Sequence, residues 1–397
     1  MRLALVYHQM IGRGGLEKYL LALARALSDR GHVVRLVTAR TDGAAEALGL
    51  GLTRIGLRGV PKWCRLAIFA RRAAALPPVP GELVLGFGRT WGQDVHRAGG
   101  GCHALYSSLL PWWKRWSPKN RLELGLERRL YRGGETRHFV VNAAPVAGQL
   151  QRQYGVPAER LTVIHTAVDT ERFCPAPPAV PGGDGSGGRP VLLFVSSNHR
   201  RKGLPALLRA LGRVPEADLW VAGAPLSRRD RRLMAAEGLT DRVRMLGEVD
   251  DLAPVYRQSS WFVHPTLYDA CANTVLQSMA CGLPGLVSVA DGASEFIRDG
   301  ENGLLLAEPA EPAGLAAVVR RALAHSPDAR AAMGWAARET VLPLTWEAHV
   351  AAWEALCQRL QTAAPDCIPL SVSTTPPVSL FCPAPRRLSR GIQITTL

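Results

Sequence analysis

The strongest constraint on the fold is a succession of strand, polar loop, helix and strand that occurs twice along the chain. The first copy runs through the apolar segment 3–7, a glycine-rich loop, helically spaced leucines over 16–27 and a second apolar segment at 33–39. The second copy occupies residues 191–222. Because a helix that connects two strands in this way favours a parallel sheet, we expect an α/β protein with two doubly wound domains that face a cleft.

Composition divides the 397 residues further. The Pro- and Gly-rich segment 174–190 predicts a linker or loop between an N-terminal domain at 1–173 and a C-terminal domain at 191–344. An apolar stripe at helical spacing predicts a final helix over 345–361. Residues 362–397 are rich in Pro, Ser and Thr without an apolar period, which predicts a disordered tail.

The excess of basic residues is confined to the first domain. Of the 48 basic and 33 acidic side chains, residues 1–150 hold 23 and 9, whereas residues 151–397 hold 25 and 24. A basic surface of this kind suits nucleic acid or an anionic membrane or glycolipid. No helix-turn-helix, zinc-finger or RNA-binding motif accompanies the charge, so we expect an anionic membrane surface as the partner and no nucleic acid.

Two basic stretches also contain aromatic residues. Segment 58–72 interleaves five cations with Trp63 and other apolar residues, as in an interfacial amphipathic helix. Pro111–Trp116 places three tryptophans beside Lys114 and Arg115, a composition that suits the boundary between headgroups and acyl chains. The alternative is that these aromatic residues belong to the core and that the arginines form a solvated face.

The sequence offers no signal for export, membrane crossing or metal binding. No apolar run approaches the ~20 residues of a membrane-spanning helix, and the N-terminus lacks the features of a signal peptide. The eight cysteines are scattered without metal-ligand spacing. We therefore expect a cytoplasmic protein with reduced thiols and no metal site.

The first loop carries a candidate anion site. Gly14 and Gly15 stand where the first predicted helix begins, and the N–H groups and dipole of a helix N-terminus favour an anion. The dinucleotide pattern G-x-G-x-x-G is broken by Glu17, so we do not expect NAD. The structural alternative is a tight turn.

Cations follow the first strand of the second domain. Arg201 and Lys202 come after the predicted strand 191–197, at the carboxyl edge of the sheet, where open α/β folds bind ligands. An arginine can bind two phosphate oxygens at once and a lysine adds a point charge. The loop therefore predicts a diphosphate site, and the structural alternative is a solvated basic surface loop.

A second polar loop precedes the predicted helix at 273–281. Asp269 and the backbone N–H groups of Asn273 and Thr274 fall at the same edge of the sheet. Gln277 lies about one helical turn further along. These four residues are candidates for contacts with the same ligand.

Together these segments resemble the retaining glycosyltransferases of family 4, which have the GT-B architecture of two Rossmann-like domains, and in particular the lipopolysaccharide core glucosyltransferases. The resemblance covers nearly the whole of 1–361 and rests on the order and spacing of short motifs. They are 14–19, 30–33, Val141-Asn142, 154–157, 163–169, 172–173, 201–203 and 265–284, and 94–106 resembles the acceptor-side segment of the lipopolysaccharide subgroup.

The resemblance implies that a hexose is transferred, with anomeric retention, from a nucleotide diphosphate sugar to a lipopolysaccharide core or related glycolipid. The donor would be UDP-linked, no cofactor or metal would be needed, and the enzyme would work on the cytoplasmic face of the inner membrane. Gly14 and Gly15 would approach the donor phosphates from the first domain, and Arg201 and Lys202 would hold the diphosphate from the second. The final helix would return to pack on the first domain.

The family's Glu-x7-Glu pair falls on Asp269 and Gln277. Asp269 would contact the sugar, whereas Gln277 would bind the ribose without the usual negative charge. A glutamine carbonyl still accepts hydrogen bonds, so we expect donor binding weaker by about 1–3 kcal/mol. The alternative is a catalytically impaired, glycosyltransferase-like binding protein, and a basic nucleic-acid-binding protein is less favoured.

On the acceptor side, Asp94 and His103 are the candidates for a catalytic base. The family subgroup's acid at this place is replaced by glycine near Gly100. Each candidate has a structural alternative, a helix cap for Asp94 and a loop hydrogen bond for His103.

Overall fold

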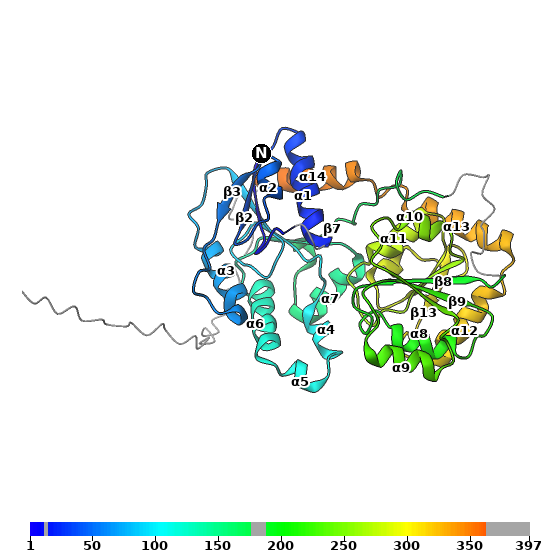
Figure 1. Cartoon of the computed structure of the whole chain (residues 1–397). Helices are drawn as coiled ribbons and strands as arrows, with labels where there is room; N and C mark the ends of the chain where they lie inside the picture. The colour runs from blue at the N-terminus through cyan, green and yellow to red at the C-terminus, as the bar shows by residue number, and fades with distance from the viewer. Residues whose placement is uncertain (12–14, 176–187, 363–397) are drawn as a thin grey trace, which may run out of the picture.

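The computed structural model describes residues 1–11, 15–175 and 188–362. Gly14, most of the predicted linker and the predicted tail lie outside these residues, so the expectations for them stay predictions. The described chain forms two α/β domains, coloured blue to cyan and green to yellow in Figure 1.

The N-terminal domain is built on a seven-stranded parallel sheet with the order β3-β2-β1-β4-β5-β6-β7. Its strands are β1 (Arg2–Val6), β2 (Val33–Thr38), β3 (Gly51–Arg54), β4 (Glu82–Gly86), β5 (Val95–Arg97), β6 (His138–Val141) and β7 (Leu161–Val163). Its helices are α1 (Gly15–Asp29), α2 (Ala44–Ala47), α3 (Arg65–Ala74), α4 (His103–Ser108), α5 (Trp112–Arg115), α6 (Pro118–Arg132) and α7 (Ala144–Tyr154).

The C-terminal domain is built on a six-stranded parallel sheet with the order β10-β9-β8-β11-β12-β13. Its strands are β8 (Val191–Ser196), β9 (Asp218–Gly223), β10 (Val243–Gly247), β11 (Trp261–His264), β12 (Gly285–Ser288) and β13 (Gly303–Leu306). Its helices are α8 (Leu204–Leu211), α9 (Arg228–Ala236), α10 (Ala253–Arg257), α11 (Asn273–Ala280), α12 (Pro312–Leu323) and α13 (Pro327–Val341).

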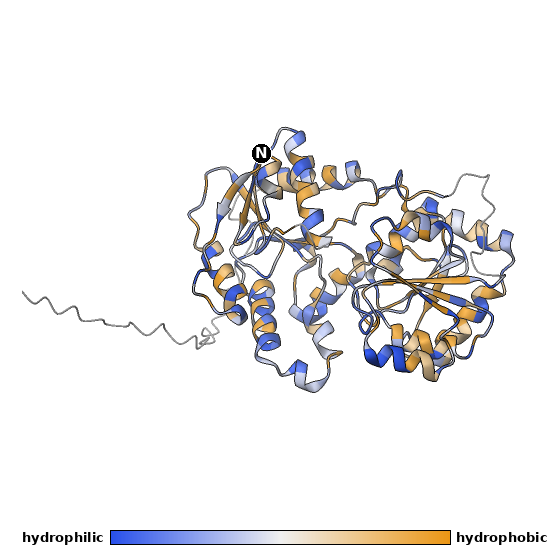
Figure 2. Cartoon of the chain, in the orientation of Figure 1, coloured by the Kyte–Doolittle hydropathy of each residue, from blue (hydrophilic) through white to orange (hydrophobic). Residues whose placement is uncertain are grey.

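Apolar residues concentrate on the strands and on the inward faces of the helices that cover them (Figure 2). In the second domain, Phe194 and Phe262 from adjacent strands are fully buried. Burial of such side chains is the main favourable term in folding. The expected class, two doubly wound parallel sheets, is confirmed.

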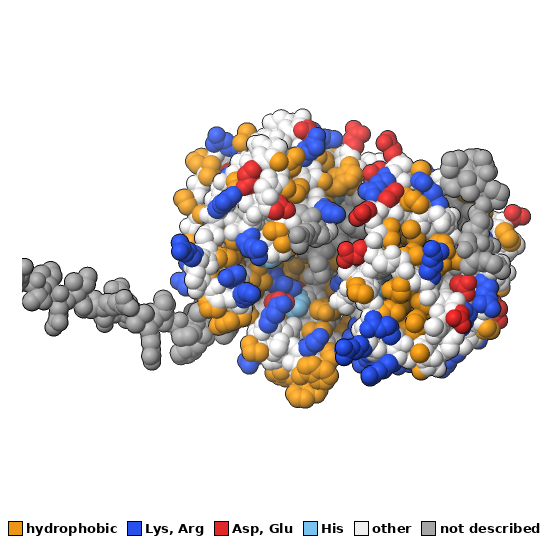
Figure 3. Space-filling model, in the orientation of Figure 1, with side chains coloured by type: hydrophobic (Ala, Val, Ile, Leu, Met, Phe, Trp, Pro, Cys, Tyr) orange, Lys and Arg blue, Asp and Glu red, His pale blue; other side chains and the backbone are white. Residues whose placement is uncertain are grey.

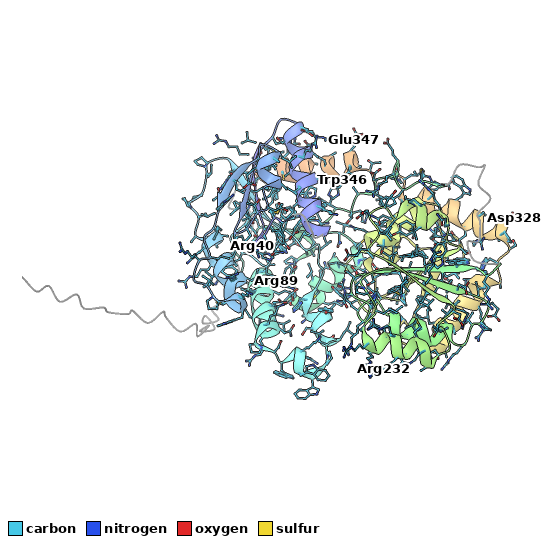
Figure 4. All side chains as sticks on the ribbon, viewed as in Figure 1. Arg40, Arg89, Arg232, Asp328, Trp346 and Glu347 are labelled. Atoms are coloured by element: carbon cyan, nitrogen blue, oxygen red, sulfur yellow. The ribbon has the colours of Figure 1, made fainter. Side chains whose placement is uncertain are left out.

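The last described helix, α14 (Trp346–Thr362), returns to the first domain. Val350, Trp353 and Leu356 are buried in one cluster with Leu3 and Leu23 of the N-terminal sheet and its first helix. Their spacing of three to four residues puts them on one face. The predicted return of the final helix is therefore confirmed, and its first residue Trp346 is labelled in Figure 4.

The basic, aromatic segment 58–72 packs on the sheet through only one of its aromatic side chains. In this segment the α-helix begins only at Arg65, and its Phe69 is buried against Ala4 and Val37 of the sheet, whereas Trp63 is exposed. The core alternative is therefore confirmed for Phe69, whereas the interfacial prediction for Trp63 stays a prediction. Within the described residues, no helix is both long and apolar enough to cross a bilayer.

Candidate active site

The carboxyl edge of the second sheet brings together three of the predicted residues. Lys202, in the loop after β8, donates a hydrogen bond from its ammonium to Asp269 Oδ2, which follows β11. Arg201 Nη2 lies 3.7 Å from the same carboxylate oxygen. The two loops are adjacent because β8 and β11 pair in the sheet.

Gly203 allows the backbone at Lys202 to lie close to the end of β11. Gly203 has φ +83°, and a Cβ at this residue would collide with the carbonyl oxygen of Pro265. Left-handed backbone and close approach both favour glycine. The start of α8 can therefore lie directly against the end of β11, which brings Lys202 to within 3.1 Å of His264 Nε2.

A buried pair lies beneath the ion pair. His264 Nε2 is 3.0 Å from Asp291 Oδ2, and both side chains are fully buried. The pKa of His264 is lowered by burial and by the charge of Lys202, with Asp291 acting in the opposite sense. Burial alone would raise the pKa of Asp291, but its hydrogen bond to His264 and the charge of Lys202 lower it.

These side chains also form the one group of metal-ligating type found among the described residues. One ligand atom each from His264, Asp269 and Asp291 lie within 4.8 Å of one another. The Lys202 ammonium contacts two of the three residues. The chain itself thus supplies a cation to this group.

The first two turns of α11 carry the remaining predicted donor-binding residues. No side chain caps this helix, whose first residues are Asn273 and Thr274. Gln277 Oε1 accepts a hydrogen bond of 3.3 Å from the Tyr256 hydroxyl. The Gln277 side chain is half-buried, so it lies at the edge of the site rather than in the core.

The first domain contributes an arginine that sequence analysis missed. Arg97 is the last residue of β5 and only 7% exposed, and its guanidinium lies 4.1 Å from the centre of the Tyr19 ring. In the described part of the chain no carboxylate lies within 4.0 Å of it, and its Nε has no partner. A buried charge without a carboxylate partner is costly, which makes Arg97 a candidate for binding an anionic ligand.

Gly15 lies at the start of the same helix that carries Tyr19. Gly15 is exposed and has open space around it, since no atom lies within 4 Å of the position of an added Cβ. Among the described residues packing therefore does not require glycine here, and a helix N-terminus of this kind favours an anion.

The loop after β5, which follows Arg97, contacts the second domain. The Cys102 N–H donates to the Tyr268 hydroxyl, which in turn donates to Gln149 Oε1 at 3.1 Å. Gly101 has φ +71°, and a Cβ there would collide with the same hydroxyl. The acceptor-side loop and the loop that holds Asp269 are thus in direct contact.

The two candidate bases occupy different environments. His103 follows this contact directly, and its Nε2 lies 2.9 Å from Asn120 Oδ1 and 3.3 Å from Glu123 Oε2. Burial and the charge of Arg89, labelled in Figure 4, lower the pKa of His103, against the opposing effect of Glu123.

Asp94 is placed elsewhere. It precedes β5, so it lies at the opposite end of that strand from Arg97 and the acceptor-side loop. Its Oδ2 accepts from the Val84 N–H at 2.8 Å and its Oδ1 lies 3.1 Å from Arg137 Nη1. The structure does not bring Asp94 to the cluster of Lys202 and Asp269, and its contacts are those of a structural residue.

Family models and known proteins match this chain in sequence. Residues 189–325 match the family model for glycosyl transferases group 1, and residues 85–172 match that for glycosyltransferase family 4. A probable transglycosylase of Burkholderia thailandensis is 30% identical over 321 residues, which cover 78% of this chain and 83% of the relative. The lipopolysaccharide glucosyltransferase WaaG of Escherichia coli K12 is 24% identical over 338 residues, or 81% and 89% of the two chains.

Solved structures agree in fold. The crystal structure of WaaG superposes with a TM-score of 0.74 at 22% identity and covers 91% of this chain and 100% of that chain. Anabaena HepE, solved in complex with UDP and glucose, superposes with a TM-score of 0.67 at 17% identity over 90% and 100% of the two chains.

Proposed function

Because this chain belongs to the group 1 and family 4 glycosyltransferases and has their GT-B fold, we propose that it transfers a hexose from a nucleotide diphosphate sugar to a lipopolysaccharide core or related glycolipid. The observation that carries this proposal is the cluster of Arg201, Lys202 and Asp269 at the carboxyl edge of the second sheet. Tyr268, the residue before Asp269, accepts a hydrogen bond from Cys102 of the acceptor-side loop. We propose UDP as the nucleotide, since HepE was solved with UDP.

The cations would stabilise the leaving group. As the glycosidic bond to phosphate breaks, the sugar gains oxocarbenium character and negative charge grows on the diphosphate. Arg201 and Lys202 on one side and Arg97 and the Gly15 helix end on the other would neutralise that charge. Since these groups are held in place before reaction, little reorganisation energy is spent.

This chemistry needs neither an enzyme nucleophile nor a metal ion for the step itself. Lys202 already lies among the residues that would otherwise coordinate a metal. We therefore propose a metal-independent reaction with retention, in which Asp269 positions Lys202 and contacts the sugar.

His103 is the acceptor-side base in this proposal. Its lowered pKa keeps the imidazole neutral near pH 7, the form that can accept a proton from a sugar hydroxyl. Its position next to Cys102, which contacts Tyr268, puts it at the boundary between the domains.

The glycolipid would be reached at a membrane surface. The first domain carries the basic excess of the chain, and three tryptophans of the segment 111–116 are exposed. Cations together with exposed aromatic rings favour an anionic lipid surface.

The proposal is tested by incubating purified protein with UDP-glucose, UDP-GlcNAc, GDP-mannose or ADP-heptose, with and without a lipid-linked oligosaccharide. We expect one donor to give slow hydrolysis alone and faster sugar transfer when the acceptor is present. No turnover with any donor would contradict the proposal.

One observation favours a second candidate function, that of an impaired binding protein. Gln277 replaces a carboxylate at the position proposed to bind the ribose. If the parent binds nucleotide sugar without turnover while Gln277→Glu is active, this second function is the correct one.

A further inference from the structure

The second domain carries an arginine patch that its balanced net charge conceals. The patch is formed by the loop between β8 and α8, by α8 and by α9, and all of its side chains are exposed. In the described chain none of these side chains lies within 4.0 Å of a carboxylate. The arginine patch consists of Arg200, Arg209, Arg228, Arg229, Arg231 and Arg232.

One acid, Asp230, lies within this region and lines the same hollow, so the patch keeps a large net positive charge. Asp230, on α9, is buried, and it accepts a hydrogen bond of 2.6 Å from the Ser227 hydroxyl at the start of the helix. Six exposed guanidinium groups without carboxylate partners create a strong local positive potential. Such a surface is suited to an anionic partner.

The shape of the patch also suits phosphate groups. Arg200, Arg209 and Arg229 line a hollow of about 540 Å³ between α8 and α9. Asn198 and Ser227 contribute polar groups to its wall. The hollow is therefore open to solvent, cationic and able to donate hydrogen bonds to headgroup oxygens.

The second part of the surface is α5 in the first domain together with Trp116, the residue that follows it. Trp112, Trp113 and Trp116 are 73%, 57% and 68% exposed, and Lys114 and Arg115 lie among them. Contiguous exposed aromatic residues of this kind mark an interaction site. Tryptophans beside cations are typical of side chains that enter the headgroup layer of a bilayer.

The two parts lie at the same end of the molecule. Figure 3 shows basic side chains over α9 and an apolar group over α5, both at the lower end of the visible face. Arg232 is labelled at this lower end in Figure 4. One flat surface could therefore contact both domains at once.

We infer that the arginine patch binds the headgroup phosphates of an anionic bilayer while the tryptophans of α5 enter its surface, so that both domains rest on one membrane. The inference rests on the proposed function, which places the acceptor in a lipid phase. A nucleic acid is the less favoured occupant, because the aromatic residues lie on the other domain from the arginine patch rather than between its cations.

The test compares co-sedimentation with vesicles of pure phosphatidylcholine and of phosphatidylcholine with 30% phosphatidylglycerol. The patch variant is Arg228→Gln, Arg229→Gln and Arg232→Gln, which spares Arg231 because that side chain bonds to the Leu226 carbonyl. The charge-matched control replaces Arg2, Arg25 and Arg54 by Gln, because these exposed arginines lie outside the basic, aromatic segments 58–72 and 111–116 that are proposed to face the membrane. A third variant replaces Trp112, Trp113 and Trp116 by Ser.

We expect the patch variant to lose about tenfold or more of its affinity for anionic vesicles, and the control to bind as the parent does. The tryptophan variant should bind both vesicle types more weakly. All variants should keep the parent's affinity for UDP, which shows that the donor site is folded.

Parent-like binding of the patch variant to anionic vesicles would overturn the inference, even with full sugar transfer by the parent. A patch variant that loses affinity for duplex DNA but not for vesicles would also overturn it. If the parent binds neither vesicle type, the inference fails together with the membrane part of the proposed function, whereas donor hydrolysis tests the enzymatic part separately.

Discussion

Lys202 and Asp269 are 67 positions apart in the chain, yet their side chains form a direct ion pair at the edge of the second sheet. The pairing of β8 with β11 brings their loops together, and the missing side chain of Gly203 lets them touch. The carboxylate thus holds the ammonium in place before any ligand arrives. A bound diphosphate would share this ammonium with Asp269.

Replacement of Lys202 by Met should weaken UDP binding by roughly 10- to 100-fold, because a charged hydrogen bond is worth about 1.5–3 kcal/mol. Isothermal titration calorimetry measures this effect. Lys119→Met is the matched control, since Lys119 is 79% exposed on the first domain. Equal affinities of the Lys202 variant and the parent would contradict the assignment of the diphosphate site.

Replacement of Gln277 by Glu should tighten donor binding by about tenfold, because a carboxylate accepts both ribose hydroxyls more strongly than an amide does. The Tyr256 hydroxyl, which already donates to Gln277, can donate to the new carboxylate as well. The KM for the donor sugar reports the change. A raised or unaltered KM would show that this residue does not face the ribose.

The substitution Arg97→Met should lower activity without lowering the stability of the fold. A buried charge without a carboxylate partner costs folding free energy, so an apolar side chain of similar length should leave the thermal midpoint unchanged or raise it. The kcat/KM for sugar transfer should fall by at least about tenfold, because the diphosphate loses a cation. A large drop in the thermal midpoint with parent-like kcat/KM would instead assign Arg97 a structural role.

The return of α14 to the first domain should depend on pH. His349 Nδ1 lies 2.6 Å from the His165 carbonyl and its Nε2 lies 2.8 Å from the Tyr19 hydroxyl. Burial lowers the pKa of His349 to about 4. Its neutral form is therefore favoured by folding, and this contribution is present above about pH 6.5 and is lost as the pH falls toward 4.

The thermal midpoint of the parent should consequently decrease between pH 7 and pH 4.5. His349→Gln should start from a lower midpoint and decrease less over the same range, because one titrating group has been removed. His96 and His138 also have lowered pKa values, about 3 and 4, through burial, so part of the decrease will persist. An identical pH dependence in the variant would contradict this account of α14.

Much of the second domain follows from local sequence signals. The apolar period after Gly203 predicted α8 with its observed bounds, and the helix after the Asp269 loop ends within one residue of its prediction. Because parallel strands end at one edge, the residues that follow β8 and β11 had to meet there. That argument placed Arg201, Lys202 and Asp269 together.

The misplacement of Asp94 has a simple topological cause. Residues before a parallel strand lie at the edge opposite to residues after it, and Asp94 precedes β5 whereas Arg97 ends it. The bounds of β5 decide at which edge of the sheet each residue lies. A strand of three residues is too short to show an alternating apolar pattern in the sequence, so these bounds were not predicted. The resemblance of segment 94–106 to an acceptor-side segment therefore did not give the correct location of Asp94.

Other features depend on tertiary contacts that no local pattern encodes. Arg97 stands out because no carboxylate lies near it in the described structure, which composition does not reveal. The arginine patch is hidden in a domain with balanced charge, since its acids lie elsewhere on the fold. Helix α13 was not predicted because its many alanines and Gly334 give only a weak apolar stripe.

The most direct test of the account is a crystal structure of the protein with bound UDP. We predict that the diphosphate lies between the first turn of α1 at Gly15 and the ammonium of Lys202, with the ribose toward Gln277. A diphosphate found away from this gap, for example in the hollow lined by Arg200 and Arg229, would contradict the central claim.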